Sequence, residues 1–243
     1  MFTKKKWTEL NKPPKEVFDD ACIFLAESLE GKGFSYLRST NTLIKDDNIE
    51  DLQFMVDFGT TARNQKNVQV NFNVHLVIRS SRLKAWRKKM FLAKNWGEPD
   101  DLITNIGLGH LMANNDYASG SWNLIESNPK IILDAIERYA LPAFQKFNRV
   151  DELIQDLRNG ETIPFCFDFQ KLDFLMCFGG QEFAAECLNT ILSERNWHEV
   201  FHNKLDLLRN GQDIDKSQGL ISQLVHRADF YDIKLSKTEQ QKH

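Results

Sequence analysis

Several features that would assign this chain to a broad functional class are missing from its sequence. No apolar run approaches the roughly 18 residues that span a bilayer, and the lysine-bearing residues 1–7 are not followed by the apolar stretch of a signal peptide. The net charge is only −3, which gives no overall attraction to nucleic acid or to anionic membranes. We therefore expect a cytoplasmic protein with no membrane partner and little tendency to bind nucleic acid.

Cysteine and proline are sparse as well. The four cysteines, Cys22, Cys166, Cys177 and Cys187, have no metal-ligand spacing. All but Cys166 lie among apolar residues of predicted helices, where cysteine behaves as a small hydrophobe. A reduced protein is therefore expected, and no cofactor is predicted. Apolar residues make up 42% of the 243, with 18 phenylalanines against 6 prolines, which indicates a globular chain with one large domain or a domain plus an extension.

The first part of the chain changes from helical to strand periodicity. Apolar residues recur at helical spacing between Pro13 and Gly31, and the period becomes two from Phe34 onwards. Strands are expected at residues 34–44, 52–58, 68–78, 104–112 and 121–125, and helices at 83–92 and 130–140. The alternation is clearest in 68–78, where only Val77 interrupts the polar face. Short strands linked by turns favour an antiparallel meander with one face exposed to water.

The second part of the chain is helical. After Leu141-Pro142, helices are expected at 150–157, 169–178, 181–195, 197–210 and 218–225. The Gly179-Gly180 turn between two of them is typical of a helical-repeat pair. The sequence thus predicts an α+β fold, in which an antiparallel meander of about five strands packs with helices and an all-α tail of helical hairpins follows. The predicted organisation is an N-terminal arm (1–14), an α+β domain (15–158), a helical region (159–233) and a disordered tail (234–243).

A set of apolar and glycine positions links the α+β part to a known family. The set comprises a helix running into Gly33-Phe34, strands around Phe54 and Phe72–Ile78, Ile106–Leu111, Trp122, Ala140–Phe144, Phe147 and the helix from Val150. Over residues 15–158 the chain resembles a bacterial family described only as a domain of unknown function, number 4304. The family's aromatic pair near Trp122 is reduced here to one tryptophan. The resemblance implies a meander sheet backed by helices and no activity; by analogy, such small bacterial proteins often serve as immunity or partner-binding proteins.

The one string typical of an enzyme is His198-Glu199-Val200-Phe201-His202. On a helix, this H-E-x-x-H pattern holds zinc between two imidazoles one turn apart, with the glutamate as general base. A catalytic site also needs a third protein ligand. Leucines occupy the metzincin positions 205 and 208, and the only later glutamate is Glu239 in the tail. The residues left as third ligands are His226, Asp229 and Asp232.

The helical projection of this segment favours a structural interpretation. Val200, Phe201, Leu205, Leu207 and Leu208 cluster around Trp197 as a buried stripe, with His198 and His202 at its edge. Arg209 falls between the two histidines in angle, and its permanent positive charge opposes metal binding. We therefore interpret the histidines as half-exposed residues of an amphipathic helix. A zinc hydrolase built on His198, Glu199 and His202 is kept as an alternative.

Residues 79–89 form the densest group of cations: Arg79, Arg82, Lys84, Arg87, Lys88 and Lys89. On a helix from Ser81, Leu83, Trp86 and Met90 share one face and the cations take the rest. Such a group is either a solvated helix face or a basic patch that binds an acidic partner or nucleic acid.

Other signals of catalysis are incomplete. His110 lies near Asp116 and Tyr117, but the chain has no G-x-S-x-G elbow. Gly107-Leu108-Gly109 lacks the third glycine of a dinucleotide site. No catalytic residue is predicted. The leading hypothesis is a non-enzymatic protein that binds a protein partner, such as a cognate toxin that it neutralises. The alternatives are the zinc hydrolase and nucleic-acid binding through Arg79–Lys89.

Overall fold

The computed structural model describes residues 12–45, 51–94, 100–112, 117–159, 165, 168–215 and 219–235, without the side chains of 91–94, 117 and 119. The chain divides into two compact units. The first comprises residues 1–81 and 101–148, and the second comprises 82–100 and 149–243. This division differs from the expected boundary at residue 158, because the helix after Ser81 belongs with the C-terminal helices and the first unit ends at Asn148.

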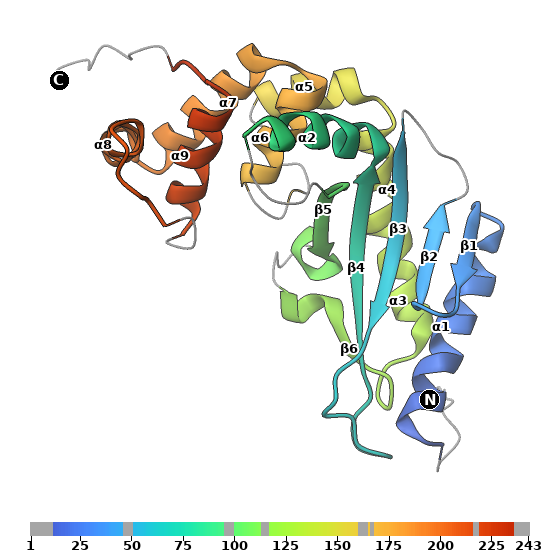
Figure 1. The fold of residues 1–243 in the computed structure, drawn as a ribbon. Helices are drawn as coiled ribbons and strands as arrows, with labels where there is room; N and C mark the ends of the chain where they lie inside the picture. The colour runs from blue at the N-terminus through green and yellow to red at the C-terminus, as the bar shows by residue number, and fades with distance from the viewer. Residues whose placement is uncertain are drawn as a thin grey trace. The chain divides into compact units, whose positions relative to one another are not determined.

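The first unit contains an antiparallel sheet, as predicted. Its strands are β1 (Phe34–Leu37), β2 (Thr42–Lys45), β3 (Leu52–Gly59), β4 (Asn71–Ser80), β5 (Leu102–Gly107) and β6 (Ser121–Asn123). They follow the meander order β1-β2-β3-β4-β5, and β6 pairs with β4 (Figure 1). The segment 34–44 is a hairpin rather than one strand, since Asn41 adopts a positive φ of 54° and Tyr36 pairs with Leu43. The α+β fold class is confirmed.

Helices cover one face of this sheet and form the core of the unit (Figure 1). They are α1 (Pro14–Glu30), α3 (Pro129–Ala135) and α4 (Leu141–Phe147). Aromatic contacts join the layers: the ring of Phe18 lies 5.2 Å from that of Phe72, and the ring of Phe54 lies 5.1 Å from that of Phe144. The alternation in β4 is as expected, because Phe72, Val74, Leu76 and Ile78 are buried on this side.

Two expected elements of the first unit end differently. The expected helix 130–140 continues through Leu141-Pro142 by way of a π-helical turn, η3 (Ile136–Ala140). Because proline has no backbone N–H and its ring crowds the preceding turn, a wider turn lets the helix pass it. The expected strand 104–112 stops at Gly107 and becomes a 3₁₀ turn, η1 (Leu108–Leu111), followed by η2 (Tyr117–Gly120).

The second unit is helical. Its elements are α2 (Ser81–Lys94, whose first residue belongs to the first unit), α5 (Val150–Arg158), α6 (Asp168–Phe178), α7 (Gln181–Glu194), α8 (His198–Arg209) and α9 (Leu220–Phe230). Helices α6 and α7 pack as a hairpin, and α8 and α9 pack as a second one. Gly180, at φ 90°, makes the turn before α7 in a conformation that side chains other than glycine rarely adopt. None of the described helices combines the length and the apolar character needed to cross a membrane.

Candidate functional site

The basic stretch 79–89 is divided between the two units. Arg79 is the residue before the last of β4, in the first unit, where its Nη1 lies 2.6 Å from Oδ1 of Asp101. The other five cations are on α2, in the second unit. The stretch is therefore not one continuous patch of a single helix, and the candidate surface is confined to α2.

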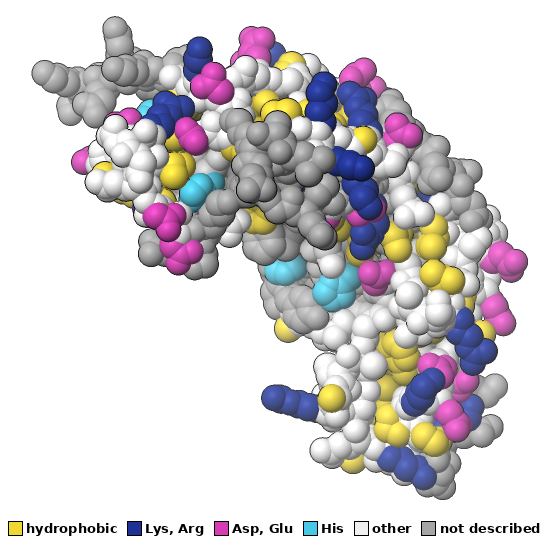
Figure 2. Space-filling model, viewed as in Figure 1, with side chains coloured by type: hydrophobic (Ala, Val, Ile, Leu, Met, Phe, Trp, Pro, Cys, Tyr) yellow, Lys and Arg dark blue, Asp and Glu magenta, His cyan; other side chains and the backbone are white. Residues whose placement is uncertain are grey.

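The exposed side of α2 carries four of these cations. Arg82, Lys84, Lys88 and Lys89 are exposed, and Figure 2 shows dark-blue side chains gathered over this helix. Arg82 is held in place, since its guanidinium lies 4.5 Å from the Phe178 ring and donates to the carbonyl oxygen of Cys177. The three lysines have no hydrogen-bond or ion-pair partner among the described residues. Their charge is therefore available to another molecule.

Arg87, unlike these lysines, is buried on the inner side of α2. We expected it on the exposed face, but its side chain is only 5% exposed. Its Nη2 donates to Oδ2 of Asp173 at 2.8 Å, and its Nη1 binds the carboxylate of Asp100. A buried guanidinium is tolerated because carboxylates replace the water that it loses. Arg87 cannot contribute to a surface that binds a partner.

Asp173 is the residue that sequence reasoning missed. It is 1% exposed and, besides Arg87, accepts from Nε of Arg227 at 3.0 Å and from the hydroxyl of Tyr231 at 2.6 Å. Burial, together with the negative charge of Asp173, raises the pKa of Tyr231, so the phenol stays protonated and donates. The available signal was a single carboxylate among Leu172, Phe174 and Leu175, on the apolar side of a predicted helix. Such a carboxylate needs buried partners.

The ring of Trp86 completes the inner side of α2. It lies 5.3 Å from the ring of Tyr231, next to the fully buried Leu83. Together with Arg87, these side chains join α2 to α6 and α9 within the second unit. The helix thus has an inner face fixed by a buried charge cluster and an outer face whose lysines have no partner among the described residues.

The two histidines of the H-E-x-x-H string begin α8. Their rings lie 6.4 Å apart, and Nε2 of His198 is 3.0 Å from Oγ of Ser193. Two of the three proposed third ligands are engaged elsewhere, because His226 Nε2 donates to the Ile214 carbonyl at 2.5 Å and Asp229 pairs with Arg209 at 3.2 Å. Within the described residues no group of three metal-binding side chains comes together.

The buried stripe of α8 is narrower than the projection indicated. Phe201 and Leu205 are buried, whereas Val200 and Leu207 are 47% and 42% exposed. A helix at the edge of a helical unit has neighbours on one side only, so part of its apolar stripe remains in water. Here α8 packs against α9 and α7.

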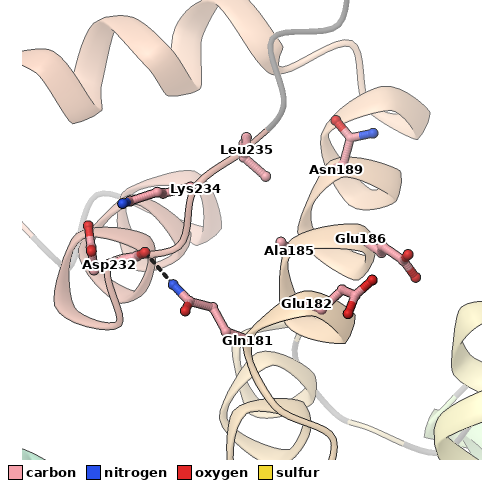
Figure 3. Close-up of a pocket in the computed structure, with 8 residues that line it drawn as sticks. All are labelled: Gln181, Glu182, Ala185, Glu186, Asn189, Asp232, Lys234 and Leu235. Carbon is pink, nitrogen blue, oxygen red and sulfur yellow. Dashed lines mark hydrogen bonds between the residues drawn. The ribbon is translucent and has the colours of Figure 1, made fainter.

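A pocket of about 510 Å³ lies between α7 and the segment that follows α9 (Figure 3). Its lining comprises Gln181, Glu182, Ala185, Glu186, Asn189, Asp232, Lys234 and Leu235. The Gln181 side chain bridges the two sides by donating to the Asp232 carbonyl oxygen at 2.5 Å. The carboxylates of Glu182 and Glu186 point away from the Asp232–Leu235 segment, so the charged groups do not converge on one point (Figure 3).

The open side of the sheet in the first unit holds a smaller polar group. His75 and Asp57 are opposite each other on β4 and β3, and His75 Nδ1 lies 3.2 Å from Oδ1 of Asn105. The buried Oδ1 of Asp57 has no hydrogen-bond partner among the described residues. His110 is exposed on η1. Asp116, Glu239, Cys166 and residues 236–243 of the predicted tail lie outside the described part of the chain.

Comparison with family models, with curated proteins and with solved structures gives no match. The resemblance of residues 15–158 to the domain of unknown function number 4304 therefore stays a prediction. Any function has to be argued from the chemistry of this chain alone, and α2 offers the most definite surface.

Proposed function

We propose that this protein is a non-enzymatic binding protein that recognises an acidic protein partner through the exposed face of α2. The observation that carries this proposal is the division of α2 into a fixed inner face and an outer face, on which Lys84, Lys88 and Lys89 have no partner among the described residues. Unpaired lysines on a helix repel one another slightly, so they contribute little to folding. Facing an acidic surface, the same charges would speed association and select the partner.

A rigid platform supports this interpretation. Side chains at the rim of an interface lose conformational freedom on binding, which costs affinity. The backbone that carries the lysines is already fixed by the buried pair of Arg87 and Asp173, so only the lysine side chains need to be ordered. Arg82 is further restrained by its contact with Phe178.

The number of cations favours protein over nucleic acid. Affinity for nucleic acid grows with the number of phosphates neutralised, and proteins whose binding depends steeply on salt make about 6–10 phosphate contacts. The α2 face offers four exposed cations on a chain of net charge −3. A partner with a compact acidic patch matches this surface better than a polyanion. A toxin with such a patch, neutralised by this protein, is the most concrete version.

The proposal is tested with a fluorescein-labelled peptide of ten glutamates and with single-stranded DNA of matched charge. The wild-type protein should bind the peptide, and Lys84→Glu/Lys88→Glu should weaken binding by about tenfold or more, which is ~1.4 kcal/mol. Lys66→Glu/Lys130→Glu is the matched control, since it changes the charge equally at exposed lysines of the first unit. Equal losses in both variants would contradict a specific α2 surface. Tighter binding of DNA than of peptide would instead favour the nucleic-acid alternative.

The partner itself is sought with the same variants. Wild-type protein and Lys84→Glu/Lys88→Glu serve as parallel baits in extracts of the native host. The expected result is one stoichiometric acidic protein on the wild-type bait that is reduced on the variant. A partner retained equally by both baits would place the interface elsewhere.

A further inference from the structure

The charge cluster beneath α2 joins three helices of the second unit at one carboxylate. Asp173 on α6 accepts hydrogen bonds from Arg87 on α2, from Arg227 on α9 and from Tyr231, the residue after α9. Asp173 and Arg87 are nearly inaccessible, and Arg227 is 15% exposed. The carboxylate therefore has three donors and little access to water.

The positive charges of this cluster are balanced in part by Asp100, a residue at the surface. Two guanidiniums face one buried carboxylate, and the second carboxylate is that of Asp100, whose side chain is 67% exposed. Asp100 and Arg87 belong to the same chain segment, 82–100. If this segment moved away, Arg87 would keep Asp100 as its partner, while Asp173 would retain Arg227 and Tyr231. The hydrogen bond between Arg87 and Asp173 is therefore an ionic link between that segment and the helical hairpins.

Long side chains make further contacts between α2 and its neighbours. Trp86 contacts Tyr231, and Arg82 contacts Phe178. The helices of each hairpin, by contrast, lie close together along their length. An element held mainly by side chains opens more easily than one packed along its length. The position of α2 should thus be sensitive to the loss of a single buried partner.

We propose that Asp173 is a positioning residue for α2: by binding Arg87 it fixes the helix so that Lys84, Lys88 and Lys89 face outward on an ordered backbone. Its effect on partner binding rests on the function proposed above, but its effect on the order of α2 does not. Asp173 itself is buried, so it acts on the binding of another protein only through α2.

Hydrogen exchange in the full-length protein tests this role. In Asp173→Asn, the amides of α2 should exchange at least about tenfold faster than in the wild type, whereas those of α1 should be unchanged. Asp168→Asn is the matched control, because Asp168 is also on α6 but pairs with Arg195 and Lys171 instead of with α2. Asp173→Glu, which keeps the charge, should restore part of the protection.

Binding of the ten-glutamate peptide gives a second readout. Asp173→Asn should bind the peptide more weakly, but the salt dependence of binding should be unchanged because every surface lysine is still present. Lys84→Glu/Lys88→Glu should alter that salt dependence. If the wild type does not bind the peptide, the proposed function fails, and the exchange result still decides the role of Asp173.

Two results would overturn the inference. One is that α2 in Asp173→Asn exchanges at the wild-type rate while protection in α6 and α9 is uniformly weaker. Asp173 would then be a core residue of the hairpins only. The other is equal loss of α2 protection in Asp168→Asn. If Asp173→Asn does not fold, Arg87→Gln removes the same link from the α2 side, and wild-type exchange of α2 in that variant would reject the proposal.

Discussion

Arg87 and Asp173 lie 86 residues apart in the chain and meet through a 2.8 Å hydrogen bond inside the second unit. Their side chains are 5% and 1% exposed. Removing one partner of such a buried pair lowers stability more than replacing both partners by apolar residues. The reason is that a single change leaves the other charge unpaired in a dry environment. This asymmetry gives the first prediction.

Asp173→Leu should lower the free energy of unfolding by about 3–5 kcal/mol. The double variant Arg87→Met/Asp173→Leu should lose less than the sum of the two single changes, since no unpaired charge remains on α2. Arg227, which is partly exposed, can turn towards water. Chemical denaturation of the four proteins measures the coupling, and additive losses would show that the two residues act independently.

Gly120→Ala should destabilise the first unit. A Cβ at this position would overlap the backbone nitrogen of Gly109, and the chain relieves this clash only by moving η1 away from η2. Overpacking of this kind costs about 1–3 kcal/mol.

Gly31→Ala is the matched control for that change. A Cβ there meets nothing within 4 Å, and the backbone at Gly31 is helical, with φ −63°. Its expected effect is a gain of about 0.4–1 kcal/mol from reduced freedom of the unfolded chain. Thermal denaturation compares the two variants, and similar melting temperatures would contradict the close approach of Gly109 and Gly120.

Stability should fall at alkaline pH because buried thiols stay protonated in the folded chain. Burial raises the pKa of Cys22 from 9.0 to about 12, and those of Cys177 and Cys187 to about 11. The unfolded chain ionises these thiols above about pH 9, so stability is complete below that pH and is lost as pH rises. The two buried thiols, Cys22 and Cys187, each contribute a slope of about 1.4 kcal/mol per pH unit until the folded pKa is reached, and the half-buried Cys177 contributes less.

Cys22→Ala isolates one of these contributions. Between about pH 9 and 11, the free energy of unfolding of the variant should fall less steeply with pH than that of the wild type. The expected difference in slope is that of one ionising thiol, about 1.4 kcal/mol per pH unit. Urea denaturation at several pH values measures this difference. Identical slopes in the two proteins would mean that Cys22 is not protected from ionisation in the folded state.

The alternative zinc site makes a distinct prediction. A hydrolase using His198 and His202 would contain one zinc ion per chain, which His202→Ala would abolish. We expect no stoichiometric zinc, because His226 and Asp229 are occupied by Ile214 and Arg209. Metal analysis of protein purified without a histidine tag decides between the two, and zinc that is lost in His202→Ala would restore the hydrolase hypothesis.

The elements that local patterns specify strongly were predicted well. The alternation in β4 and the helical spacing in α1, α6 and α7 locate those elements to within a few residues. Segments where a local signal competes with packing were predicted less well. Pro142 indicated a helix end, but the continuous core formed by Ala140, Phe144 and Phe147 holds the helix together across a π turn.

The candidate surface was predicted only in part. The group of cations at 79–89 was evident, yet its division between Arg79 and α2, and the burial of Arg87, depend on contacts distant in sequence. A helical projection gives the angle of Arg87 but not what lies at that angle. The carboxylate that accepts Arg87 comes from a helix 86 residues later.

The sequence by itself determined the α+β class, the meander of short strands and the helical C-terminal part, because alternation of apolar residues is a local property of the chain. Only the tertiary structure decided that α2 belongs with the C-terminal helices and that Arg87 faces inward while its neighbouring lysines face water. The physical reason is that a buried charge is placed where a partner is available. That partner, Asp173, is brought to α2 by folding and by no local pattern.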